Sequence, residues 1–235
     1  MTDAVWQAFA LLGSLNADLI EIIGLSLRVS LAAVLIAALV GLPLGALIAT
    51  RRFPGRGAAI VLVNTLMGLP PVVVGLMVYL WLSASGPFGA LQLLYTPTAM
   101  IVAQTILVAP ILIALTRQIV ADLDAELGQQ LRIFGLTRWQ QILTLLHEGR
   151  AALTTALLAG FGRAIAEVGA VLIVGGNINH VTRTMTTAIA LETSKGELAL
   201  AMALGLVLIF IAGLVNAAAM ALRGGADAQL APGRS

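Results

Sequence analysis

Two residues of opposite charge, Arg163 and Glu167, stand four positions apart inside a long apolar stretch of the sequence. At this spacing the two side chains lie on the same side of an α-helix and can form an ion pair. A charge near the centre of a bilayer costs about 2.5–3.5 kcal/mol on insertion scales, so we expect the pair to face the protein interior. The pair could gate a transport path or sense an anion. It could equally be structural and tie its helix to a neighbour or to a second copy of the chain.

A second group of candidate ligand-binding residues lies in the segment 175–196, which is rich in hydroxyl and amide groups. Arg183 adds a positive charge, and Thr186 and Thr187 are among the donors that could hydrogen-bond an oxyanion. The other donors are Asn177, Asn179, Thr182 and Thr184. The same composition suits a solvated loop that docks an external partner. Threonine and asparagine do not single out one ligand.

Several kinds of chemistry are excluded by residues that the sequence lacks. It has no cysteine, and so no disulfide, thiolate metal site or redox couple. Its two histidines, His147 and His180, are expected on opposite sides of a membrane, so no metal site is predicted. Its single lysine, Lys195, does not follow the glycine-rich loop of a phosphate-binding motif. The sequence therefore predicts a protein that is not an enzyme, holds no cofactor, and takes any ATP energy from a partner.

The composition indicates an integral membrane protein, because 60% of the residues are hydrophobic and only 10% are charged, against about 25% charged in soluble domains. A membrane helix needs about 20 mainly apolar residues. Five stretches qualify, at 25–50, 58–82, 97–116, 151–174 and 198–222. We therefore predict an all-α polytopic membrane protein with about five transmembrane helices.

The whole chain, 1–235, is predicted to form a single transmembrane domain with its core at about 20–222. The apolar piece at about 4–15 is too short to span a membrane and is predicted to form an N-terminal interfacial helix. Residues 223–235 are predicted to form a short tail.

The arginines and the lysine predict the orientation of the chain. Nine of them flank the spans on one side: Arg51, Arg52, Arg56, Arg117, Arg132, Arg138, Arg150, Arg223 and Arg234. Only Arg183 and Lys195 lie on the other side. Because positive residues concentrate in the cytoplasm, the N-terminus is predicted outside and the C-terminus inside. The basic isoelectric point then follows from topology, and no nucleic acid partner is predicted.

A polar segment at 124–143, between the third and fourth stretches, is patterned as two short amphipathic helices separated by Gly135. Apolar residues recur at helical spacing in both halves: Leu123, Leu127, Leu131 and Phe134, then Trp139, Ile142, Leu143 and Leu146. Gly135 can adopt the positive φ that ends one helix, and Thr137 can cap the next. The segment is predicted to be a cytoplasmic helix–turn–helix that docks an energy-supplying partner.

Prolines interrupt two of the apolar stretches. Pro70 and Pro71 should break the second stretch, and Pro110 lies within the third. Broken helices persist in membranes where protein or a water-filled cavity satisfies the freed backbone groups, so they often line transport paths. A simple packing kink is the alternative. The pair Pro70–Pro71 is the strongest candidate for a break in a path.

The order of five spans, the helix–glycine–helix segment and the run Arg163-Ala-Ile-Ala-Glu-Val-Gly169 resemble the permease subunits of type I ABC importers for oxyanions. Within that group the runs 166–178 and 186–196 are most similar to tungstate permeases. The resemblance covers roughly residues 20–222. The family's cytoplasmic Glu-Ala-Ala–glycine signature is matched at Gly135 and, at its aliphatic position, by Leu145, whereas Gln129, Gln130 and Leu131 replace Glu-Ala-Ala.

The resemblance implies a homodimer in the cytoplasmic membrane of a prokaryote, with two copies of an ABC ATPase inside and an oxyanion-binding protein outside. It also implies that the cytoplasmic turn docks into the ATPase, with the coupling residues Leu131, Phe134, Gly135, Leu136, Thr137, Arg138 and Trp139. Candidates for the translocation path or gate are Pro70, Pro71, Arg163, Glu167, Arg183, Thr186 and Thr187.

Three functions from different classes follow. The first is an ABC importer permease, for tungstate or alternatively for molybdate or sulfate. The second is an ion-coupled secondary transporter, against which the odd number of spans without an evident inverted repeat counts. The third is a membrane scaffold, in which the kinked spans and the intramembrane ion pair would serve no purpose.

Overall fold

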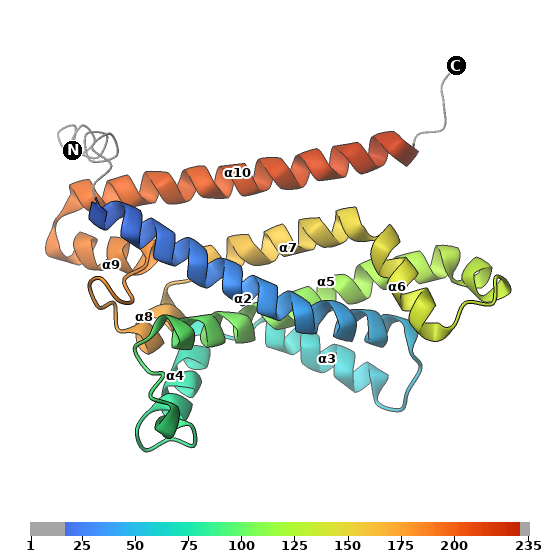
Figure 1. The fold of residues 1–235 in the computed structure, drawn as a ribbon, viewed down its shortest axis with the longest axis horizontal. Coiled ribbons are helices and arrows are strands. Elements are labelled where there is room, and N and C mark those ends of the chain that lie inside the picture. Colours follow the sequence, from blue (N-terminus) through green and yellow to red (C-terminus); the bar gives the residue numbers. More distant parts are fainter. Residues whose placement is uncertain (1–16, 231–235) are drawn as a thin grey trace. The chain divides into compact units, whose positions relative to one another are not determined.

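The computed structural model describes residues 17–230, with side chains up to residue 221. The predicted interfacial helix at 4–15 and the end of the tail, including Arg234, lie outside the described residues, as does the side chain of Arg223. Regular secondary structure within 17–230 is entirely helical (Figure 1). The helices are α2 (Ala17–Thr50), α3 (Arg56–Met67), α4 (Pro71–Leu82), the 3₁₀ helix η1 (Gly89–Leu91), α5 (Pro97–Ile133), α6 (Arg138–Glu148), α7 (Arg150–Ile165), α8 (Gly169–Gly175), α9 (Met185–Lys195) and α10 (Leu198–Leu230).

Three helices in the described part of the chain, α2, α5 and α10, are long and apolar enough to cross a membrane. The number rises to five when α3 with α4, and α7 with α8, each count as one broken span. The predicted all-α fold with about five spans is therefore confirmed. Helix α10 continues to Leu230, so part of the predicted tail is helical.

The second span breaks where the prolines predict. Helix α3 ends at Met67, Pro70 is the residue before α4, and Pro71 is the first residue of α4. Proline suits the first turn of a helix, where its missing N–H would have no partner, but it cannot continue the helix that precedes it. Pro110, in contrast, lies inside the continuous helix α5.

Three local predictions are wrong in detail. The stretch 151–174 is two helices, because α7 ends at Ile165 and α8 begins at Gly169. Residues 124–133 do not form a separate short helix but continue α5, since nothing before the Gly135 turn interrupts the helix. The segment 175–196 is not simply a loop, because α9 occupies half of it.

The chain divides into two compact units. The first contains the described residues up to Ala33, Leu69–Leu107 and Phe161–Gly213. Its core includes Val74, Met100 and Val171. Helices α4 and α8 cross closely there, because a Cβ on Gly75 would lie 2.8 Å from the Cα atom of Ala170. The small side chains at this crossing allow the two backbones to touch.

The second unit contains Val34–Gly68, Val108–Gly160 and the described residues from Leu214 onward. Its small core is made by Ala46, Val120, Ile142 and Leu145, and it packs α6 against α5 and the end of α2. This core fixes the position of the polar segment around Gly135.

Candidate functional site

The turn between α5 and α6 is built by local signals in the sequence. Gly135 has φ 72°, which ends α5, and the N–H of Leu136 donates to the carbonyl of Leu131 over 3.2 Å. Thr137 then caps α6: its Oγ1 accepts from the N–H of Gln140 at 3.4 Å, and its own N–H donates to Oε1 of Gln140 at 2.8 Å. The predicted roles of Gly135 and Thr137 in the turn and the cap are confirmed.

One face of α6 is buried against the second unit's core. Ile142 and Leu145 are buried, with Leu127, Leu131 and Leu146 packed around them. Nε2 of Gln141 donates to Oδ1 of Asp124 over 2.6 Å and adds a polar tie between α6 and α5. Apolar burial and this hydrogen bond together hold α6 on α5.

A second set of apolar side chains around the turn points outward. Phe134 is 77% exposed, Leu143 63% and Trp139 57%. The expected common face of Leu123, Leu127, Leu131 and Phe134 is wrong for Phe134, because Phe134 follows the last residue of α5 and no longer obeys the helical period. Leu136 is half-buried and Arg138 is exposed. We call Phe134, Trp139 and Leu143 the turn surface.

The break in the fourth span is organised by Glu167. Its side chain is 5% exposed, and its Oε2 lies 2.5 Å from Nη1 of Arg163, so the predicted ion pair is present. Glu167 itself lies beyond the end of α7, not on its helical face as expected. The second oxygen, Oε1, accepts a hydrogen bond from the N–H of Ala170 at 3.2 Å. One carboxylate therefore neutralises an arginine and caps the start of α8.

Two further side chains contact the backbone of this break. Nε2 of Gln104, on α5, donates to the carbonyl of Ala164 over 3.0 Å, and Oγ1 of Thr186, on α9, donates to the carbonyl of Glu167 over 2.8 Å. The sequence analysis missed Gln104. Its signal was an amide side chain inside the apolar stretch 97–116, of the kind that needs a hydrogen-bond partner in a membrane.

The two broken spans meet in the first unit. A Cβ on Gly169, the first residue of α8, would lie 2.9 Å from Cγ2 of Val72, the residue after Pro71. Both broken backbones thus come together at the first turns of α4 and α8. The same Cβ would lie 3.6 Å from Oε1 of Glu167, so the residue after the predicted path residue Pro71 meets the segment that carries Glu167.

Four threonines of the segment 175–196 are buried and hydrogen-bonded within the protein, namely Thr182, Thr184, Thr186 and Thr187, while Thr193 is exposed. Oγ1 of Thr182 donates to the carbonyl of Gly175 at 2.5 Å, and Oγ1 of Thr187 receives the N–H of Thr184 at 3.0 Å. Nη1 of Arg183 lies 3.7 Å from Oε1 of Glu192, whose side chain is buried. These four threonines therefore stabilise the fold of this segment, whereas the predicted donor Asn179 is exposed.

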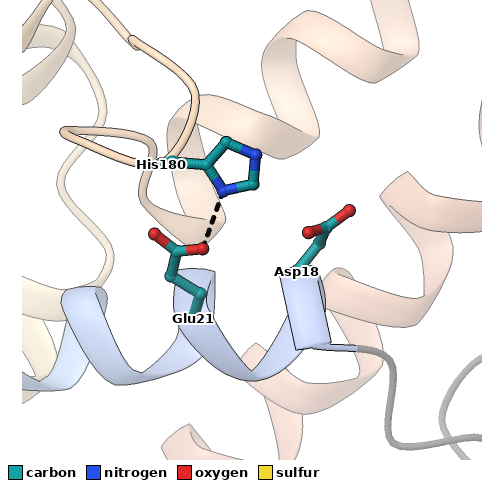
Figure 2. Close-up of side chains that lie close together, drawn as sticks. All are labelled: Asp18, Glu21 and His180. Carbon is teal, nitrogen blue, oxygen red and sulfur yellow. Dashed lines mark hydrogen bonds and ion pairs between the residues drawn. The ribbon is translucent and has the colours of Figure 1, made fainter.

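A surface cluster joins the start of α2 to the loop before α9 (Figure 2). Nδ1 of His180 lies 2.8 Å from Oε2 of Glu21, and Asp18 lies beside them, with one oxygen or nitrogen of each residue within 4.8 Å of the others. The hydrogen bond that His180 donates to Glu21, and then the charge of Glu21, raise the pKa of His180. All three side chains are exposed, and the ion pair joins His180 to Glu21.

Three long apolar helices and two bent helix pairs define, in the described part of the chain, the fold of a polytopic helical membrane protein. A solved structure of the MetNI methionine ABC transporter in an inward-facing conformation shares this fold. The TM-score is 0.67 at 17% identity, and the match covers 88% of this chain and 95% of that chain.

The chain belongs to the family of binding-protein-dependent transport system inner membrane components, whose profile matches residues 41–228. It is a multi-pass permease of the inner membrane, and its family works with an ATPase and a substrate-binding protein.

Curated relatives are similar over most of their length. The chain is 44% identical to a probable anion ABC transporter permease of Haloferax volcanii, over 88% of this chain and 91% of the relative. It is 42% identical to the tungstate uptake permease TupB of Peptoclostridium acidaminophilum, and the match covers 92% of this chain and 95% of the relative. A molybdate/tungstate permease of Thermococcus kodakarensis is 33% identical, and the match covers 66% of this chain and 60% of the relative. The predicted resemblance to oxyanion ABC permeases is confirmed.

Proposed function

We propose that this chain is the membrane-spanning subunit of an ATP-driven tungstate importer. The observation that supports this most is the similarity to the tungstate permease TupB over 92% of this chain. The named molybdenum and sulfate permeases are more distant, at 26% identity. Molybdate and sulfate are therefore the alternative substrates.

The proposed importer contains two copies of this chain, two ATPase subunits and an external oxyanion-binding protein. The N-terminus lies outside and the C-terminus inside. This orientation places the turn surface in the cytoplasm, where its exposed aromatic side chains suit an anchoring role, because buried aromatic residues dominate protein interfaces.

The turn surface is the proposed contact with the ATPase. Two of its apolar side chains, Trp139 and Leu143, stand on α6, whose opposite face is packed against α5. A push on Trp139 therefore moves α6 and the end of α5 together. Helix α5 is continuous from Pro97 to Ile133 and also carries Gln104, which contacts the broken span. Helix α5 is therefore the proposed connection along the chain between the turn and the residue that contacts the break.

Transport is tested in proteoliposomes that contain the permease with its ATPase and binding protein. We expect uptake of labelled tungstate that excess tungstate suppresses more strongly than molybdate or sulfate at equal concentration. Stronger suppression by molybdate or sulfate assigns the substrate to that anion. No uptake of any of the three contradicts the importer function.

The turn is tested by Trp139→Asp and Gly135→Pro. Each should lower ATP-driven uptake by about tenfold or more, as expected when an anchor worth about 1.4 kcal/mol or more is lost, while membrane insertion is retained. Gly135→Asn is the matched control, because asparagine tolerates the positive φ at this position. Normal uptake by both Trp139→Asp and Gly135→Pro refutes the coupling role.

The orientation is tested with single cysteines, since the chain has none of its own. In intact cells, a membrane-impermeant thiol reagent should label His180→Cys and leave Leu143→Cys unlabelled. The reverse pattern contradicts the proposed topology.

A further inference from the structure

Gln104 is an unusual residue for its surroundings. Its side chain is 3% exposed on α5, and its Oε1 is buried without a hydrogen-bond partner among the described residues. An unsatisfied buried oxygen is unfavourable. A residue that only filled space here would be leucine or methionine. The amide is therefore explained by its other end, which donates the 3.0 Å hydrogen bond to the carbonyl of Ala164.

Ala164 is one of the residues whose carbonyl loses its normal partner at the break. In a continuous helix its carbonyl would accept from the N–H of Val168, four residues later. Helix α7 ends at Ile165 instead, and the carbonyl accepts from Gln104 and from the N–H of Glu167 at 3.1 Å. Gln104 thus supplies, from another helix, a hydrogen bond that the break removes.

Thr186 does the same for a second carbonyl at the break, that of Glu167. The carbonyl of Glu167 would accept from the N–H of Val171 in a continuous helix. In the structure the carbonyl of Glu167 accepts a hydrogen bond from the hydroxyl of Thr186, a residue of α9 that is 6% exposed. The hydroxyl predicted to meet an anion is therefore used to hold the backbone next to the Arg163–Glu167 pair.

We propose that Gln104 and Thr186 are positioning residues for transport, which hold the broken backbone at 166–168 and so place the carboxylate of Glu167 against Arg163. This inference rests on the proposed function, in which the broken span lines the path. Without either side chain, a buried carbonyl has lost a donor, and arrangements of the segment that satisfy it by other means become more populated.

Amide hydrogen exchange of the purified protein tests this directly, without transport. In Thr186→Val, which keeps the shape and removes the hydroxyl, we expect the amides of Glu167 and Ala170 to exchange about tenfold faster, the change that corresponds to one hydrogen bond of about 1.4 kcal/mol. Gln104→Met should act in the same direction. Thr186→Ser restores the hydroxyl and should restore slow exchange.

Thr105→Val is the matched control. Thr105 is the neighbour of Gln104 on α5, and its hydroxyl donates to the carbonyls of Ile101 at 2.7 Å and Ala33 at 3.4 Å, in unbroken helices. We expect unchanged exchange at the break in this variant. Equal acceleration in Thr105→Val and Thr186→Val, or no acceleration in Thr186→Val, overturns the inference.

Transport per ATP hydrolysed provides the functional readout. Thr186→Val should lower tungstate uptake per ATP by about fivefold or more, with Thr186→Ser and Thr105→Val close to the wild type. Wild-type complex that imports no oxyanion contradicts the proposed function. Wild-type import together with an unchanged ratio in Thr186→Val contradicts only the positioning role.

Discussion

Arg163 and Glu167 form an ion pair at 2.5 Å in which the two partners differ greatly in burial: the arginine side chain is 40% exposed and the glutamate 5%. Only the glutamate is held by further hydrogen bonds in addition to the ion pair. Its Oε1 accepts from the N–H of Ala170, and its backbone carbonyl accepts from the hydroxyl of Thr186. The pair is therefore a buried carboxylate with its counter-ion at the edge of the break.

This asymmetry predicts unequal effects of removing each partner. Arg163→Met leaves a buried carboxylate without its counter-ion and should lower the free energy of unfolding by about 2 kcal/mol. Glu167→Gln keeps an oxygen for the N–H of Ala170 and leaves an arginine that reaches solvent or headgroups, so it should cost less. Thermal unfolding of the purified protein measures both. The double variant should be more stable than Arg163→Met alone, and a less stable double variant contradicts this account.

The crossing of α4 and α8 predicts a strong effect of a single methyl group. A Cβ on Gly75 would lie 2.8 Å from Cα and 3.2 Å from the carbonyl oxygen of Ala170, and neither backbone atom can move alone. Gly75→Ala should destabilise the protein by about 1–3 kcal/mol.

Gly24→Ala is the control for this substitution, because a Cβ on Gly24 meets nothing within 4 Å. Its unfolding temperature should equal or exceed that of the wild type, since alanine favours the helix. An unfolding temperature of Gly75→Ala equal to that of Gly24→Ala would show that the two helices can separate without cost.

The His180–Glu21 contact predicts a pH-dependent tether on the loop before α9. Glu21 raises the pKa of His180 through a hydrogen bond and its charge, Asp18 acts in the same direction, and Arg183 opposes them. Because the folded pKa is raised, the stabilisation is complete below the ordinary value of 6.5 and is lost as the pH rises through the folded pKa.

The measurement is the protection of the amides of residues 176–184, that is, their exchange rate relative to that of an unfolded peptide at the same pH. This protection should be greater at acidic pH than at alkaline pH. His180→Gln should remove this difference, whereas His147→Gln, on another segment, should retain it. An identical pH profile in the wild type and in His180→Gln would mean that the contact does not order the loop.

The sequence by itself determined the features that depend on neighbouring residues. The length of each apolar stretch predicts the spans. Pro70 and Pro71 break the second span between α3 and α4, because proline has no N–H to donate to the preceding helix. Gly135 specifies the turn through its positive φ. Thr137 specifies the cap through its hydroxyl, which accepts from the N–H of Gln140 three residues later. The runs 166–178 and 186–196, which resemble oxyanion permeases, also consist of neighbouring residues, so the family can be identified from the sequence.

Only the tertiary structure decided which polar groups meet across the fold. The break after Ile165 has no proline, and its carbonyls are satisfied by Gln104, which is 60 residues from Ala164, and by Thr186, which is 19 residues from Glu167. It also turned Phe134 outward while Leu131 packed inward, because the helical period ends with α5. A backbone carbonyl accepts any donor that the fold brings near, so spacing along the chain could not name these partners.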